Sequence, residues 1–467
     1  MTSSTGVEQF RTDGEAPPPL ASVLELAARE EKRFAAANNA SRTTYDDART
    51  VLAGGVVSSF QLQQPWPVYL DRGSGPAVWD VDGTRRLDFH NGFGAMLQGH
   101  AHPGVAEILA RAAGLGTHVG ATGADAVAVA NSLRERWQLP VWRFATTGSE
   151  ATMDALRIAR AATGRDVVVK MFGAYHGHHD AVLVSIGDDD GGVGSGFLPS
   201  LPAGEGIPDE VAALTAAVPF NDAEALEARL GALAADGRPA ACVILEPVFQ
   251  MGVLVPEPGY LEAVREVTCR HGALLVFDEV KSGFATGPGG FTARSGVVPD
   301  IVTVGKALGA GLPVSGVGAS VEVMDLVATR RVVQAGTFNG NAMAMAVARH
   351  NLDQVLIPEA HARLAELGQR LLVGCEQELV RAGRPGHGAV VGARGFLALT
   401  PTPAPDHRGV DQAHPPELSR VVWLYLMNRG VFVTPARPLQ WMVGLAHTDA
   451  DVDRYVEVFG ALVSELG

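Results

Sequence analysis

Two largely apolar segments of this chain each lead into a charged residue that an interior strand seldom carries. Residues 273–277 precede Asp278, and residues 301–304 precede Gly305 and Lys306. Short apolar runs of this length predict buried β-strands. A charged side chain at the end of such a strand needs a partner or a chemical role, because burying an unpaired charge is costly. Asp278 and Lys306 are therefore the first candidates for chemistry.

Similar apolar runs recur along the chain between segments with helical patterns. Such an alternation indicates βαβ units, and hence an α/β fold with a mostly parallel sheet. The predicted strands are residues 141–144, 167–171, 241–245, 273–277, 301–304 and 314–319.

A strand-end aspartate followed by a strand-end lysine suits an enzyme that uses pyridoxal 5'-phosphate (PLP). The lysine amine forms a Schiff base with the cofactor, and the acid pairs with the pyridinium nitrogen of its ring. An ordinary buried Asp–Lys ion pair in an α/β core is the alternative interpretation. The two segments alone leave both interpretations open.

Gly148 and Ser149 begin a predicted helix with an apolar face. The free backbone N–H groups of a helix N-terminus, a serine hydroxyl and a glycine that permits close approach would together hold an anion. A plain serine N-cap is the simpler interpretation of the same pattern.

These segments resemble the cofactor motifs of class III (subgroup II) PLP-dependent aminotransferases. The two main motifs are DEVKSGF at 278–284 and GKALG at 305–309. The segment QAGTFNGN at 334–341 narrows the resemblance to the branch that contains glutamate-1-semialdehyde aminomutase. Because further motifs agree in order over about residues 45 to 460, the match is more specific than any single motif. These further motifs are 79–83, 99–103, 148–153, 175–178 and 445–448.

The resemblance implies the PLP-dependent transferase fold type I. In this fold a large domain has a mostly parallel sheet with helices on both faces, and a smaller α+β domain is built from both chain ends. We place the large domain at 98–345, the N-terminal arm, helix and first part of the small domain at 1–97, and the C-terminal small domain at 346–467. Within these domains we expect a flexible arm at 1–19, a helix at 21–37, a surface loop at 185–208 and a helical segment at 341–382.

The resemblance also implies which residues would contact the ring of the cofactor. Lys306 would carry the cofactor and Asp278 would pair with its ring nitrogen. Tyr175 would stack on one face of the ring and Val280 would support the other face. His176 lies in the loop that contacts the cofactor in this family, so the neighbouring histidines are not expected to bind a metal, and their spacing fits no common zinc site.

The family's phosphate site falls on Gly148 and Ser149. By the same resemblance, Thr337 would reach the cofactor phosphate of the neighbouring protomer, so we expect a homodimer with shared active sites.

The chain departs from glutamate-1-semialdehyde aminomutase where that enzyme has an arginine for the substrate carboxylate. Gln61 stands at this position, and a glutamine lacks the charged bidentate fork of an arginine. Trp66 is a candidate for an aromatic substrate pocket, together with Phe60 and Phe93, although packing is their alternative role. Arg437 is our candidate for a replacement carboxylate ligand.

Composition is typical of a globular enzyme, because 47% of the 467 residues are hydrophobic and 19% are charged. The net charge of −14 argues against nucleic acid or an anionic membrane as partner. The three cysteines are widely spaced, which favours reduced thiols and a cytoplasmic location.

We therefore predict a PLP-dependent aminotransferase that moves an amino group between a small amino donor and a carbonyl acceptor through pyridoxamine phosphate (PMP). A glutamate-1-semialdehyde-type aminomutase, a racemase and a decarboxylase are alternatives on the same fold, because the pocket decides which bond breaks. A catalytically silent binding protein is the non-enzyme alternative.

Overall fold

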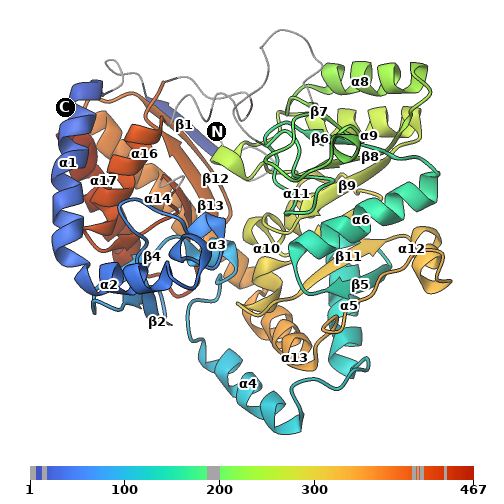
Figure 1. The fold of residues 1–467 in the computed structure, drawn as a ribbon, viewed down its shortest axis with the longest axis horizontal. Helices are drawn as coiled ribbons and strands as arrows, with labels where there is room; N and C mark the ends of the chain where they lie inside the picture. The colour runs from blue at the N-terminus through green and yellow to red at the C-terminus, as the bar shows by residue number, and fades with distance from the viewer. Residues whose placement is uncertain are drawn as a thin grey trace.

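The structure is a computed structural model that describes residues 7–12, 18–186, 200–401, 406, 410, 415–435 and 439–466. Figure 1 shows two bodies side by side. One body surrounds a large sheet made from the middle of the chain. The other body contains elements from both chain ends.

In the described part of the chain, seven strands form the large sheet in the order β5-β11-β10-β9-β8-β6-β7. All neighbouring pairs are parallel except those of β11, which runs antiparallel to β10 and to β5. The mostly parallel α/β sheet predicted from the sequence is confirmed. Its strands are β5 (Val141–Ala145), β6 (Val167–Met171), β7 (Thr215–Val218), β8 (Ala240–Leu245), β9 (Leu274–Glu279), β10 (Ile301–Val304) and β11 (Ser315–Ala319).

Helices cover both faces of this sheet because its strands are apolar on both sides. Val168 and Ile244 pack in one buried cluster with α6 (Gly148–Thr163) and α12 (Val321–Ala328). Their strand neighbours Val167, Val169 and Val243 point to the other face, because side chains alternate along a strand. There they share a cluster with α5 (Ala124–Trp137), α8 (Ala223–Ala235) and α9 (Tyr260–His271).

The smaller body combines both ends of the chain, as predicted. Its described strands form two sheets of four, in the orders β1-β12-β13-β15 and β14-β4-β3-β2. The strands are β1 (Val7–Thr12), β2 (Leu70–Ser74), β3 (Ala77–Asp80), β4 (Arg85–Asp88), β12 (Gly386–Val391), β13 (Arg394–Ala398), β14 (Val431–Phe432) and β15 (Gln440–Met442). The helices that surround them are α1 (Leu20–Ala37), α2 (Asn39–Ala48), α14 (Pro358–Arg381), α16 (Pro416–Met427) and α17 (Asp449–Glu465). The domain boundaries that we placed at 97/98 and 345/346 stay predictions.

Two local predictions were wrong. Residues 7–12 are not part of a flexible arm, because they form β1, which pairs along its whole length with β12. The segment 341–382 is not one helix. It consists of α13 (Ala342–His350), a π-helical turn (Asn351–Val355) and α14, which begins at Pro358. A proline disfavours helical backbone at the preceding residue, and Ile357 is extended.

The predicted loop at 185–208 falls partly outside the described residues, since 187–199 are not among them. Arg437 also lies outside the described residues. None of the helices within the described ranges combines the length and the apolarity that a membrane crossing requires.

Candidate active site

A cavity of about 550 Å³ opens at the carboxyl ends of four neighbouring strands, β6, β8, β9 and β10. This edge is where open α/β sheets usually bind their ligands. The sheet side of the wall comprises Gly148, Ser149, Gly173, Tyr175, His176, Gly177, Ile186, Glu246, Gln250, Met251, Asp278, Val280, Lys281 and Lys306. The smaller body and the short helical turn Ser59–Gln61 supply the other lining residues, which are Phe60, Phe89, His90, Phe93, Gly94, Thr434, Gln440, Trp441 and Met442.

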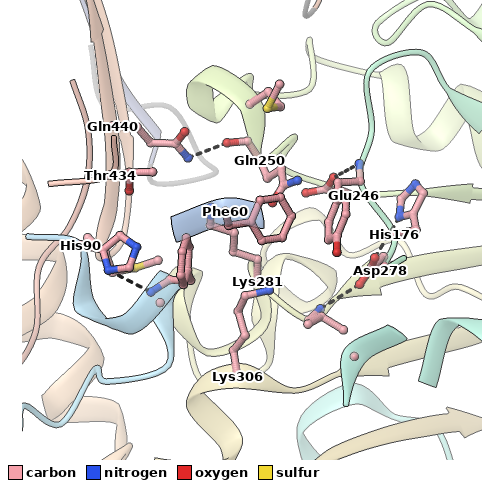
Figure 2. Close-up of a pocket in the computed structure, with 18 of the residues that line it drawn as sticks. Phe60, His90, His176, Glu246, Gln250, Asp278, Lys281, Lys306, Thr434 and Gln440 are labelled. Atoms are coloured by element: carbon pink, nitrogen blue, oxygen red, sulfur yellow. Dashed lines mark hydrogen bonds and ion pairs between the residues drawn. The ribbon is translucent and has the colours of Figure 1, made fainter. Parts of the chain in front are cut away.

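Asp278 is held rigidly at the end of β9. One carboxylate oxygen accepts hydrogen bonds from the backbone N–H of Val280 (3.1 Å) and the hydroxyl of Thr303 (3.0 Å). The other oxygen lies 2.8 Å from Nδ1 of His176 (Figure 2). Burial lowers the pKa of His176, although Asp278 opposes this shift. The carboxylate is therefore oriented from three sides and faces the cavity.

Lys306 follows β10 and reaches the same cavity. Its backbone has a left-handed φ of 46°, a conformation that is uncommon outside glycine and is found at functional sites. Burial lowers the pKa of the Lys306 amine, while Asp278 and Glu246 act in the opposite direction. A lowered pKa increases the fraction of neutral amine, which is the form that attacks a carbonyl and accepts a proton.

The N-terminus of α6 forms the third part of the site. Thr147 and Glu150 close a capping box at its first turn. The hydroxyl of Ser149 accepts a hydrogen bond from the backbone N–H of His178 (3.2 Å). A Cβ on Gly148 would lie 2.7 Å from Val280, and a Cβ on Gly177 would lie 2.6 Å from the Ser149 hydroxyl. The two glycines thus let the helix end, Val280 and the loop after β6 approach one another.

These residues fit PLP. The helix N-terminus with its free N–H groups suits a phosphate, and Tyr175 and Val280 both lie on the cavity wall where a flat ring would enter. Asp278 presents a carboxylate for the ring nitrogen, and Lys306 presents an amine for the aldehyde.

Glu246 adds a second buried carboxylate. Its side chain is 3% exposed and accepts a hydrogen bond from the backbone N–H of Tyr175 (3.3 Å). Burial and the nearby Asp278 raise the pKa of Glu246 to about 8, although Arg394 and Lys281 oppose this shift. The surroundings of Glu246 therefore favour the neutral form of its carboxyl group more than water does.

The structure does not bring every predicted site residue into the cavity. Gln61 is exposed and does not line it, whereas its neighbour Phe60 does. Trp66 packs against Phe34 at 5.9 Å between ring centroids and donates a hydrogen bond to the carbonyl of Asn38. These contacts turn its indole into the smaller body. Thr337 is exposed and lies outside the lining of this cavity.

Sequence reasoning gave no role to five polar residues on the wall, which are His90, Gln250, Lys281, Thr434 and Gln440. Lys281 lines the cavity, although it had no assigned role. Thr434 and Gln440 belong to the smaller body, and Gln440 donates a hydrogen bond of 2.5 Å to the carbonyl of Gln250 across the cavity (Figure 2). No local pattern marks Thr434 and Gln440, because their position depends on how the two bodies pack, whereas Lys281 directly follows Val280 in the segment 278–284.

Lys170 fixes the loop that carries Tyr175 and His176. Its fully buried amine donates hydrogen bonds to the carbonyls of Ala174 (2.6 Å), Val182 (3.1 Å) and Val184 (2.7 Å). Burial lowers the pKa of Lys170 to about 7. The amine joins both ends of the loop to β6.

Lys170→Met is expected to lower the free energy of unfolding by about 2–4 kcal/mol, because three buried carbonyls lose their donor. Urea unfolding measures this loss. Lys32→Met is the matched control, since Lys32 is exposed on α1, and it should change stability by less than about 0.5 kcal/mol. Equal stabilities of the two variants would contradict the assigned role of the amine.

Comparison with known proteins decides the family. The family model described as Aminotransferase class-III matches residues 60–462. The chain belongs to the class III aminotransferase family. It is a PLP-dependent enzyme of nitrogen-group transfer, and the PLP cofactor and fold type I predicted from the sequence are confirmed.

Individual relatives of this class III enzyme have different names. Glutamate-1-semialdehyde 2,1-aminomutase 2 from Brevibacillus brevis is 37% identical over 425 residues, which cover 89% of this chain and 96% of that protein. An omega-transaminase from Sphaerobacter thermophilus has a TM-score of 0.86 at 33% identity, covering 91% of this chain and 98% of that chain. A glutamate-1-semialdehyde aminomutase from Pseudomonas aeruginosa PAO1 in complex with PMP has a TM-score of 0.88 at 28% identity, covering 97% of this chain and 100% of that chain.

Proposed function

We propose that this enzyme transfers an amino group between a small amino compound and a carbonyl acceptor at the cavity between Lys306 and Asp278. The observation that carries the proposal is that an oriented carboxylate and an amine of lowered pKa face the same cavity. No nucleic acid partner enters this proposal.

PLP supplies the electron sink that weakens the bonds at the amino carbon of the substrate. Asp278 would hold a proton at the ring nitrogen of the cofactor, and Thr303 and His176 keep its carboxylate in position. Lys306 would hold the cofactor aldehyde, and its amine would move the proton at the amino carbon. Tyr175 and Val280 orient the ring.

Transamination and the aminomutase reaction are the two candidates for the specific activity of this enzyme. The names of the relatives favour a glutamate-1-semialdehyde aminomutase over the transaminase that we predicted. The cavity favours transamination, because no arginine is among its described lining residues. The sequence resemblance also places Gln61, which lies outside the cavity lining, where the aminomutase has its arginine. A buried, charged pair of hydrogen bonds from an arginine to a carboxylate, here called a clamp, contributes roughly 2–5 kcal/mol to the binding free energy. A mutase needs such a clamp because it must hold its substrate through two half-reactions.

Incubation with glutamate-1-semialdehyde alone is therefore expected to yield little 5-aminolevulinate, while an amino donor with an oxo acid supports steady turnover. Chromatography of the products measures both reactions on one preparation. Efficient formation of 5-aminolevulinate without an added oxo acid would establish the aminomutase instead, with Arg437 as the first residue to test.

The homodimer with shared sites stays a prediction. Its support is that Thr337 is exposed and lies outside the cavity of its own chain, as expected of a residue that serves a neighbouring protomer. The cytoplasmic location also stays a prediction.

A further inference from the structure

His90 lies in a strained turn on the cavity wall. The turn follows β4, and its residues Asn91 and Phe93 have φ values of 51° and 58°. Residues other than glycine rarely adopt this backbone conformation, and it persists where surrounding contacts enforce it. Here Asp88 accepts hydrogen bonds from the backbone N–H groups of His90 (2.9 Å) and Asn91 (2.8 Å). The Asn91 amide donates to the carbonyl of Met442 (2.8 Å). The turn therefore presents His90 in one orientation.

The hydrogen bonds of His90 determine where its proton lies. Nδ1 accepts from the backbone N–H of Phe93 (3.4 Å), so the proton of the neutral ring is on Nε2. Burial lowers the pKa of His90 to about 4, with Asp88 opposing and Lys281 and His100 assisting. The ring is neutral at physiological pH.

Nε2 of His90 is buried and has no hydrogen-bond partner among the described residues. Buried donors are nearly always paired, and an unpaired donor costs about 1–3 kcal/mol. A donor left unpaired on the wall of a cavity is explained if a ligand supplies the acceptor.

Aromatic rings connect His90 with the cofactor side of the cavity. Its ring lies 4.1 Å from that of Phe93, Phe93 lies 6.0 Å from Phe60, and Phe60 lies 5.4 Å from Tyr175. Figure 2 shows His90 and Thr434 on one side of the cavity, with Asp278 and His176 on the opposite side. A compound that reacts near Lys306 can therefore lie along the rings and extend to His90.

We propose that His90 donates a hydrogen bond from Nε2 to an uncharged oxygen of the substrate, and that the substrate is an amino compound with an aromatic or apolar body between this oxygen and its amino group. This substrate class rests on the proposed amino-group transfer. A neutral imidazole among aromatic rings favours an uncharged oxygen over a carboxylate, because a desolvated carboxylate needs a charged partner. The described lining residues include no arginine, and their two lysines are Lys306, which we propose holds the cofactor, and Lys281, which already has an interaction partner.

Binding of unreactive ligands tests His90 separately from catalysis. Calorimetry compares 4-ethylbenzamide, 4-ethylbenzoate and ethylbenzene on the PLP-loaded wild type, His90→Phe and His90→Gln. His90→Phe keeps a ring and removes the donor. It should therefore weaken the binding of 4-ethylbenzamide about tenfold and change the affinity for ethylbenzene by less than about twofold. His90→Gln retains an N–H donor and should restore much of the affinity for 4-ethylbenzamide.

Two results would overturn the proposal. If His90→Phe lost the same fraction of its affinity for 4-ethylbenzamide and for ethylbenzene, His90 would contribute only packing to ligand binding. A larger loss for 4-ethylbenzoate than for 4-ethylbenzamide would show that the acceptor is charged. The proposed function is judged independently by the absorbance change of the bound cofactor when wild type receives an amine donor, so a catalytically silent protein with an intact His90 effect is recognised as such.

Discussion

Lys306→Ala is expected to lower turnover by several orders of magnitude while the fold remains. The variant would lose the amine that we propose holds the cofactor and moves the substrate proton. Lys306 contributes little to packing, because its side chain faces the cavity. Steady-state kinetics measure the loss, and circular dichroism with thermal unfolding verifies the fold.

Borohydride reduction of the wild type followed by peptide mapping identifies the lysine that carries the cofactor. The structure makes this a demanding test, since Lys281 lines the same cavity and Lys170 is buried behind the loop of Tyr175. A label on either of these lysines would contradict the assignment of Lys306. Lys281→Ala is the matched control and should retain the label on Lys306.

Asp278→Asn is expected to slow the half-reaction with an amino donor by at least about a hundredfold. The substitution keeps the shape of the side chain and removes the charge that we propose retains the proton at the ring nitrogen. Cofactor binding should weaken less, because Lys306 and the phosphate site are unchanged. Stopped-flow absorbance of the bound cofactor measures the rate, and equilibrium titration with PLP measures the affinity.

Thr303→Val separates the charge of Asp278 from its orientation. The variant removes the 3.0 Å hydrogen bond from the Thr303 hydroxyl and leaves the carboxylate charged and held by His176. A loss of about tenfold or less is expected. If Thr303→Val slowed the half-reaction as much as Asp278→Asn, orientation and not charge would be the main contribution of Asp278.

Most of the large sheet was predictable because its strands are short apolar runs bounded by polar residues. The predicted runs 167–171 and 301–304 coincide with β6 and β10. The short β7 was missed, as was β1, whose sequence VEQFRT alternates only partly between apolar and polar residues. Pairing with β12 decides that β1 is a strand, and β12 lies more than three hundred residues away in the chain.

The sequence by itself predicted the α/β architecture and singled out Asp278 and Lys306, which line the same cavity, since strand periodicity and strand-end charge are local properties of the chain. It also indicated that Gln61 differs from the arginine of the aminomutase branch. Only the tertiary structure decided which side chains face the substrate. His90 lies in the turn after β4 and Gln440 begins β15 of the smaller body, and they reach the cavity because the sheets of this body pack against the carboxyl edge of the large sheet. Their chemistry depends on long-range packing and on a strained turn, and neither leaves a periodic signal in the sequence.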